Sequence, residues 1–225
     1  LHRVDRRQRQ MCIRDRGEIK EYMENRSPER FMSMIDGKKR QIDEEIRRLK
    51  NMKRFILHEE ESVRLAMNTA LDEPRLVERD REYLLVSDIS AGSERKAAVE
   101  IAEHVRMQEK YNGAVGAVGS IYLGEDLERG IYDRCVKVYT RLDKKTVSHR
   151  VQNRPEGTYV ELYSRGHLWN MEKSYRLITA FAGERGIRLG KIWYEDLMLD
   201  ELTVKAYEQY IVKVMVPVGN KVINP

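Results

Sequence analysis

The chain has 225 residues, of which 41% are hydrophobic and 35% are charged, and its formal net charge is +5. This composition is sufficient for a hydrophobic core within one or two domains, and no run of about 20 apolar residues predicts a transmembrane helix. The N-terminus lacks the apolar stretch of a secretory signal, so we expect a cytoplasmic protein with no membrane partner. Its two cysteines, Cys12 and Cys135, lie far apart and indicate neither a disulfide framework nor a metal site.

The first 16 residues carry four of the five net positive charges. A basic arm that binds nucleic acid is one interpretation of this segment. However, residues 1–16 show no helical or strand periodicity, and the string MCIRDR resembles translated sequencing-adapter sequence. We therefore predict a disordered or artefactual leader over residues 1–16.

A long helix is predicted to begin at Pro28, with Ser27 as its N-cap, and to fade near Asn68. Between Met32 and Val63, seven of ten positions at alternating steps of three and four residues are apolar, a pattern typical of a coiled-coil seam. So narrow a seam needs a partner helix, and an intramolecular hairpin is the alternative to a second copy of the chain. We assign residues 27–72 to a dimerisation helix and predict a homodimer through Ile35, Ile42, Ile46, Leu49, Ile56 and Val63.

After a predicted charged linker at residues 75–81, the pattern changes to short strands with two further helices. The predicted strands are 82–87, 113–123, 131–140, 146–151, 158–163, 192–199 and 210–216, and the predicted helices are 94–111 and 169–186. This order repeats a strand–helix–strand–strand unit. We predict an α+β fold over residues 80–218, with an antiparallel sheet and two helices on one face.

The sequence contains no nucleophile elbow, phosphate loop, zinc-ligand spacing or dinucleotide fingerprint. We therefore predict no catalytic residues, no enzyme activity, no cofactor and no metal. The string GAVGAVG at residues 113–119 lacks the GxGxxG spacing and leads into a strand. We interpret it as a bulge, or as a strand whose backbone comes close to another group.

The segment IWYEDL at residues 192–197 places a carboxylate beside two large aromatic residues in a predicted strand. Period-two alternation puts Glu195 on one face with Trp193 and Leu197, and Asp196 on the other. Burying a carboxylate costs several kcal/mol unless it is paired. A cationic aromatic ligand would supply the pairing, with cation–π attraction from the rings. The alternative is that Glu195 lies on a solvated face or pairs with an internal Lys or Arg.

Two stretches of the chain resemble MerR-type transcriptional regulators. Residues 17–56, GEIKEYMENRSPERFMSMIDGKKRQIDEEIRRLKNMKRFI, are similar to the end of the winged-helix DNA-binding domain and the start of the dimerisation helix in that family. Residues 157–201, GTYVELYSRGHLWNMEKSYRLITAFAGERGIRLGKIWYEDLMLDE, look like the second half of a GyrI-like effector-binding domain. The resemblance covers roughly residues 17–217, and it implies that residues 17–26 are a remnant of the DNA-binding domain.

The arrangement resembles the multidrug-sensing branch of the family, which implies a ligand-responsive transcriptional regulator. In that branch a glutamate in an aromatic–Glu strand motif neutralises cationic lipophilic drugs, and the matching motif here is Trp193-Tyr194-Glu195. The predicted ligand-binding residues are Glu195, Trp193, Tyr210, Tyr132 and Trp169, with Tyr163 as a further aromatic candidate.

The DNA-reading helices of the family would precede residue 17, and residues 1–16 do not resemble them. We therefore expect promoter DNA to be a partner of the full-length protein only. The alternatives are a GyrI-like small-molecule-binding protein of the gyrase-inhibitory type, or a hydrolase that uses a buried glutamate as general base. The long heptad helix argues against the first, and the lack of a companion nucleophile argues against the second.

Overall fold

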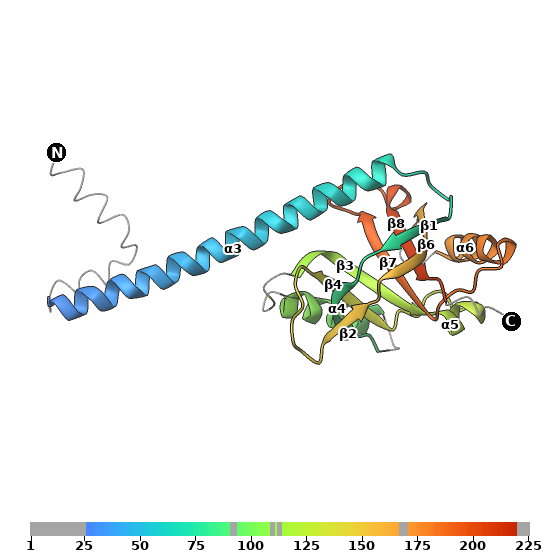
Figure 1. Cartoon of the computed structure of the whole chain (residues 1–225). Coiled ribbons are helices and arrows are strands. Elements are labelled where there is room, and N and C mark those ends of the chain that lie inside the picture. The colour runs from blue at the N-terminus through green and yellow to red at the C-terminus, as the bar shows by residue number, and fades with distance from the viewer. Residues whose placement is uncertain (1–25, 91–93, 109–110, 112–113, 167–170, 220–225) are drawn as a thin grey trace. The chain divides into compact units, whose positions relative to one another are not determined.

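The structure is a computed structural model that describes residues 26–90, 94–108, 111, 114–166 and 171–219. The predictions for the leader, for residues 17–25 and for Trp169 therefore lie outside the described residues. In chain order the elements are α3 (Pro28–Asn68), β1 (Arg75–Arg79), β2 (Glu82–Asp88), α4 (Glu94–Gln108), β3 (Ala114–Leu123), α5 (Gly124–Glu128), β4 (Lys137–Leu142), β5 (Val151–Arg154), β6 (Gly157–Arg165), α6 (Glu172–Glu184), β7 (Ile192–Leu199), the 3-10 turn η1 (Tyr207–Gln209) and β8 (Ile211–Pro217) (Figure 1). Of the described helices, none is both long enough and apolar enough to cross a membrane.

The strands form one antiparallel sheet in the order β1-β6-β8-β7-β3-β4-β2-β5. One half contains β2, α4, β3 and β4, and the other contains β6, α6, β7 and β8. In each half the third strand lies between the first and the second, and β3 pairs with β7 to join the halves. The predicted α+β class and antiparallel sheet are confirmed, and this strand order matches the predicted repeat.

Helices α4 and α6 cover the same face of the sheet, here called the α4/α6 face. His104 of α4 hydrogen-bonds to Thr140 of β4 at 3.0 Å, and Tyr175 of α6 hydrogen-bonds to Glu195 of β7. Ser120 of β3 is paired with Glu195 on one side and with Val138 on the other, so these positions and Thr140 share one face. The prediction of two helices on one face therefore agrees with the structure.

The chain divides into two units, residues 1–52 and residues 53–225. In the second unit, the last turns of α3 lie on the opposite face of the sheet, here called the α3 face. Ala66 is buried there in a cluster with Tyr163, Met198, Leu199 and Ile211. Val63, which was predicted to contact a partner chain, packs partly against this cluster and so is used within the chain.

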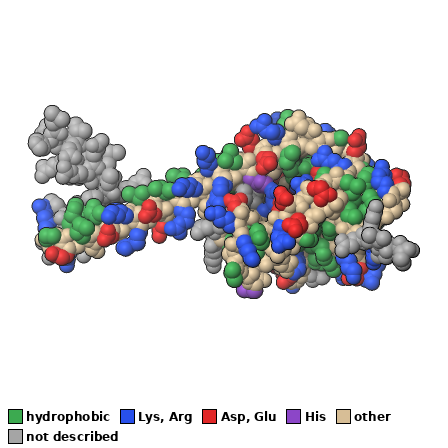
Figure 2. Space-filling view, viewed as in Figure 1, with side chains coloured by type: hydrophobic (Ala, Val, Ile, Leu, Met, Phe, Trp, Pro, Cys, Tyr) green, Lys and Arg blue, Asp and Glu red, His purple; other side chains and the backbone are tan. Residues whose placement is uncertain are grey.

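The N-terminal part of α3 presents its apolar side chains to solvent. Ile42, Ile46 and Leu49 are all exposed, and Figure 2 shows hydrophobic side chains between charged ones along this helix. Exposed apolar residues at heptad spacing are what a helix–helix seam requires. Dimerisation through this seam remains a prediction.

Three local predictions were wrong. The expected linker contains strand β1, which pairs with β6 and places Arg75 opposite Glu161. The charged residues of β1 led to the prediction of a linker. Edge strands often carry such residues, and β1 lies at the edge of the sheet. Strand β4 begins at Lys137 and not at residue 131, and the predicted strand 146–151 lies almost wholly in a turn that precedes β5.

Gly119 explains the glycine-rich string in β3. The pairing of β3 with β4 shifts register between Val115 and Gly119, as a bulge does. A Cβ atom at residue 119 would lie 2.5 Å from Cζ of Tyr139 and 2.8 Å from the carbonyl oxygen of Glu195. Both the predicted bulge and the predicted close approach are therefore present.

We expect Gly119→Ala to destabilise the domain by about 1–3 kcal/mol, because the methyl group overlaps the Tyr139 ring. Urea unfolding measures this change. Gly183→Ala in α6 is the matched control, since a Cβ atom there meets nothing within 4 Å, and it should be neutral or stabilising. Equal stability of Gly119→Ala and the wild type would show that the approach of Tyr139 is not a constraint.

Candidate functional site

Glu195 lies in the middle of the sheet, on strand β7 between β3 and β8. It is paired with Ser120 on one side and Val214 on the other, and its exposed fraction is 0%. The alternation predicted from the sequence is confirmed, because Glu195 and Trp193 lie on the α4/α6 face and Asp196 lies on the α3 face.

The carboxylate of Glu195 is held by a neutral partner. The hydroxyl of Tyr175 donates a hydrogen bond to Oε1, whereas Oε2 is buried and has no hydrogen-bond partner among the described residues. Within the described part of the chain, no Lys or Arg forms an ion pair with Glu195. The side chain is therefore not solvated, and it pairs with no Lys or Arg in the part of the chain that the structure describes.

Burial sets the protonation state of this carboxyl group. Burial raises the pKa of Glu195 to about 8, although hydrogen bonds from Tyr175 and Tyr122 lower it in part. At neutral pH the group is therefore mostly protonated. A cation placed beside Glu195 would favour the ionised form of its carboxyl group. The surroundings of Glu195 can therefore accommodate one positive charge.

Aromatic rings surround the carboxylate. Tyr175 stacks on Tyr132 with ring centroids 5.7 Å apart, and it meets Trp193 edge-on at 5.6 Å and Tyr122 at 6.1 Å. A half-open pocket of about 580 Å³ lies against these rings. It is lined by Gly124, Leu127, Glu128, Tyr132, Tyr175, Arg176, Thr179, Ala180, Leu189, Gly190 and Trp193. Tyr175 and Trp193 thus form both the pocket wall and the surroundings of Glu195.

Two predicted pocket residues lie elsewhere. Tyr163 of β6 is on the α3 face, where the guanidinium of Arg75 lies 5.5 Å from its ring centroid. Tyr210 precedes β8, and its hydroxyl donates to Glu201 at 3.1 Å. The structure therefore brings Trp193 and Tyr132 to Tyr175, the hydrogen-bond partner of Glu195, but it does not bring Tyr163 or Tyr210 there.

Tyr175 lies within the helix predicted over residues 169–186, and the sequence analysis did not assign it to the site. A chemical feature of the sequence could have indicated this residue. A tyrosine at a core position of an amphipathic helix needs a hydrogen-bond partner for its hydroxyl. No spacing rule connects it with Glu195, which lies 20 residues further along the chain. The described residues contain no group of three or more His, Cys, Asp or Glu side chains that would hold a metal ion.

The chain is similar in sequence to a named regulator. No family model matches the chain. The multidrug-efflux transporter 2 regulator of Bacillus subtilis (strain 168) is 26% identical over 204 residues, which is 89% of this chain and 74% of that protein. This chain is similar to a drug-efflux regulator. This similarity to a multidrug-efflux regulator agrees with the resemblance noted in the sequence.

Solved structures show weaker likeness. A cryo-EM structure of an EcmrR–DNA complex has 12% identity and a TM-score of 0.49, and the match covers 96% of this chain and 81% of that one. A hydrolase from Listeria innocua has 12% identity and a TM-score of 0.45, covering 68% of this chain and 95% of that one. Both TM-scores are below 0.5, so neither likeness bears on the activity of this chain.

The raised pKa of Glu195 predicts a pH dependence of stability. The folded-state pKa of Glu195, about 8, exceeds the ordinary value of 4.5. The protonated group therefore stabilises the fold fully below pH 4.5, and this contribution to the free energy of unfolding is lost as the pH rises through 8. Between pH 4.5 and 8.5, we expect the wild type to lose on the order of a few kcal/mol of unfolding free energy relative to Glu195→Gln.

Urea unfolding at several pH values measures this difference. Glu184→Gln, on the exposed end of α6, is the control and should follow the wild type at every pH. If the free energies of unfolding of the wild type and Glu195→Gln change with pH in parallel, the carboxyl group of Glu195 titrates normally and the description of the site is wrong.

Proposed function

We propose that this chain is the effector-sensing part of a MerR-type transcriptional regulator and that it binds a lipophilic aromatic cation at Glu195. One observation carries the proposal, namely that the fully buried carboxyl group of Glu195 has no cationic partner among the described residues and lies behind the wall of an aromatic pocket. Structural carboxylates at full burial are ordinarily paired, because an unpaired one is costly. The similarity to a multidrug-efflux regulator supports the same ligand class.

The geometry favours a cation that brings its own apolar surface. Tyr132, Tyr175 and Trp193 offer ring faces and edges, and such rings attract a desolvated cation by about 2 kcal/mol or more. The ligand reaches Glu195 by displacing the Tyr175 hydroxyl from Oε1. A permanently charged cation then takes the place of the proton on Glu195, so binding releases a proton below pH 8.

Control of transcription is proposed for the full-length protein. Exposed apolar residues on α3, such as Ile42 and Leu49, support a homodimer through this helix. Promoter DNA is then the partner of the full-length dimer, and the effector alters how that dimer acts on it.

We do not propose catalysis at this site. A raised glutamate pKa also suits a general base, but the hydroxyls that hydrogen-bond to Glu195 belong to tyrosines. Burial raises the pKa values of Tyr122 and Tyr175 well above their ordinary range, which makes both poor nucleophiles. A binding role therefore accounts for the group better than a catalytic one.

Titration calorimetry with tetraphenylphosphonium at pH 7.5 tests the proposal, because this cation is aromatic and has no proton to lose. We expect binding by the wild type and a tenfold or greater loss of affinity in Glu195→Gln, since a buried charge pair is worth at least about 1.4 kcal/mol.

The control for charge alone is Glu184→Gln, which removes an exposed carboxylate from α6 and should keep wild-type affinity. Triphenylphosphine oxide, which is neutral, should bind far more weakly than the cation. Equal affinity of the cation for the wild type and Glu195→Gln would exclude Glu195 as the ligand residue.

A further inference from the structure

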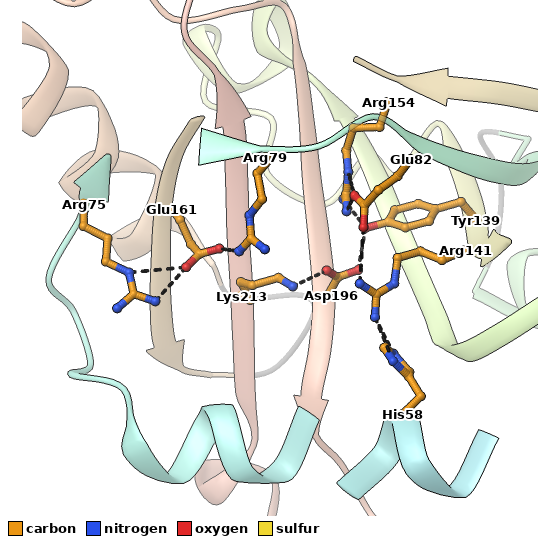
Figure 3. Close-up of polar contacts among 10 residues, drawn as sticks. All are labelled: His58, Arg75, Arg79, Glu82, Tyr139, Arg141, Arg154, Glu161, Asp196 and Lys213. Carbon is orange, nitrogen blue, oxygen red and sulfur yellow. Dashed lines mark hydrogen bonds and ion pairs between the residues drawn. The ribbon is translucent and has the colours of Figure 1, made fainter. Parts of the chain in front are cut away.

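The two neighbouring carboxylates of β7 face opposite sides of the sheet and have opposite surroundings. Glu195 lies among tyrosines on the α4/α6 face. Asp196, on the α3 face, accepts a hydrogen bond from the Tyr139 hydroxyl at 2.5 Å and forms an ion pair with Lys213 Nζ at 2.6 Å (Figure 3). Any movement of β7 at the ligand-facing residue therefore also moves a residue that is firmly held on the other face.

Asp196 is ionised throughout the physiological range. Burial alone would raise its pKa, but Lys213, Arg154 and Arg141 together hold the pKa well below its ordinary value. A buried ion pair of this kind is costly to break, because separation leaves a charge without a partner. The pair therefore moves with its strand and is not released when the strand shifts.

From Asp196, a continuous series of polar contacts leads to helix α3. Arg154 Nη1 donates to the Tyr139 hydroxyl at 3.4 Å, and its Nε donates to Glu82 at 2.6 Å. Arg141 Nη1 donates to the other oxygen of Glu82 at 3.4 Å. The series ends at His58 of α3, whose ring nitrogens Nε2 and Nδ1 lie 2.5 Å and 3.0 Å from Arg141 Nη2, the donor of this contact (Figure 3).

His58 accepts this hydrogen bond because it is neutral. Burial and the nearby Arg141 lower the pKa of His58 to about 4, so the ring keeps a free acceptor nitrogen at neutral pH. His58, Arg141, Asp196 and Lys213 also line one small pocket between α3 and the sheet. The contact therefore connects a specific side chain of α3 to the buried charges of the sheet.

The last turns of α3 are otherwise lightly held. Along the whole helix only Ser62 and Ala66 are buried, and Arg54 adds an ion pair with Asp143 at 2.5 Å between partly exposed side chains. Segments with few buried contacts open locally at low free energy. We therefore expect residues 53–68 to open from the sheet at low free energy, and the contact between His58 and Arg141 opposes this opening.

We propose that the polar network from Asp196 to His58 couples ligand occupancy at Glu195 to the docking of residues 53–68 of α3. This inference rests on the proposed function, because it assumes that a ligand binds at Glu195. Coupling requires an element with two states whose balance both sites affect, and here the docked helix end is that element. In this proposal the buried charges of Asp196, Arg154 and Arg141 have a regulatory role although the ligand does not contact them.

Hydrogen exchange with and without saturating tetraphenylphosphonium tests the coupling. In the wild type, we expect the ligand to slow exchange of the amides in residues 53–68 by at least about threefold, relative to the amides of α4. In His58→Leu the ring acceptor is lost and this local effect should disappear. His58→Gln restores an acceptor for Arg141 and should recover it.

Arg75→Gln is the matched control, because it removes a cation on the same face that contacts Glu161 and belongs to no step of the series. It should keep the wild-type response. An equal response in the wild type and His58→Leu would overturn the proposal, and so would unchanged exchange in wild-type protein that binds the cation. If calorimetry shows no binding by the wild type, the proposed function fails and the coupling fails with it.

Discussion

The alternation of side chains along β7 is the constraint on which the rest of the structure depends. The strand lies near the centre of an eight-stranded sheet whose two faces are both covered, by α4 and α6 on one side and by the end of α3 on the other. Consecutive residues must therefore be buried on opposite faces, and at residues 195 and 196 both are carboxylates. Each has to be neutralised within the domain or by something that binds to it.

The sheet resolves this problem differently on its two faces. Asp196 is neutralised internally, by Lys213 and by the arginines around it, and it remains charged. Among the described residues, the hydrogen-bond partners of Glu195 are tyrosine hydroxyls, and burial keeps its carboxyl group protonated. The α3 face thus neutralises its carboxylate with cations of the domain, whereas the α4/α6 face keeps its carboxyl group neutral by protonation. We propose that this difference places ligand binding on the α4/α6 face and the connection with α3 on the opposite face.

Periodicity predicted much of this arrangement, because it follows directly from backbone geometry. The span of α3, the faces of Glu195 and Asp196 and the repeated strand–helix–strand–strand order were all predicted from the sequence. Contacts between distant segments were not, since nothing in the spacing connects Tyr175 with Glu195 or His58 with Arg141. Strand β1 was missed because its arginines, which pair with Glu161, look like linker residues. Tyr163 shows that an aromatic residue in a strand does not reveal its face until the register is known, and Tyr210, predicted at the start of a strand, lies just before β8.

The central claim is that Glu195 is a buried, protonated acid that ionises when a cation binds beside it. Carbon-13 NMR of a protein labelled at glutamate carboxyl carbons measures this directly, with Glu195→Gln to assign the signal. The account predicts that the Glu195 carboxyl titrates near pH 8 in the free protein. Saturation with tetraphenylphosphonium should move its midpoint down by at least two pH units. A midpoint near the ordinary 4.5 in the free protein, or one that the bound cation leaves unchanged, would contradict the account.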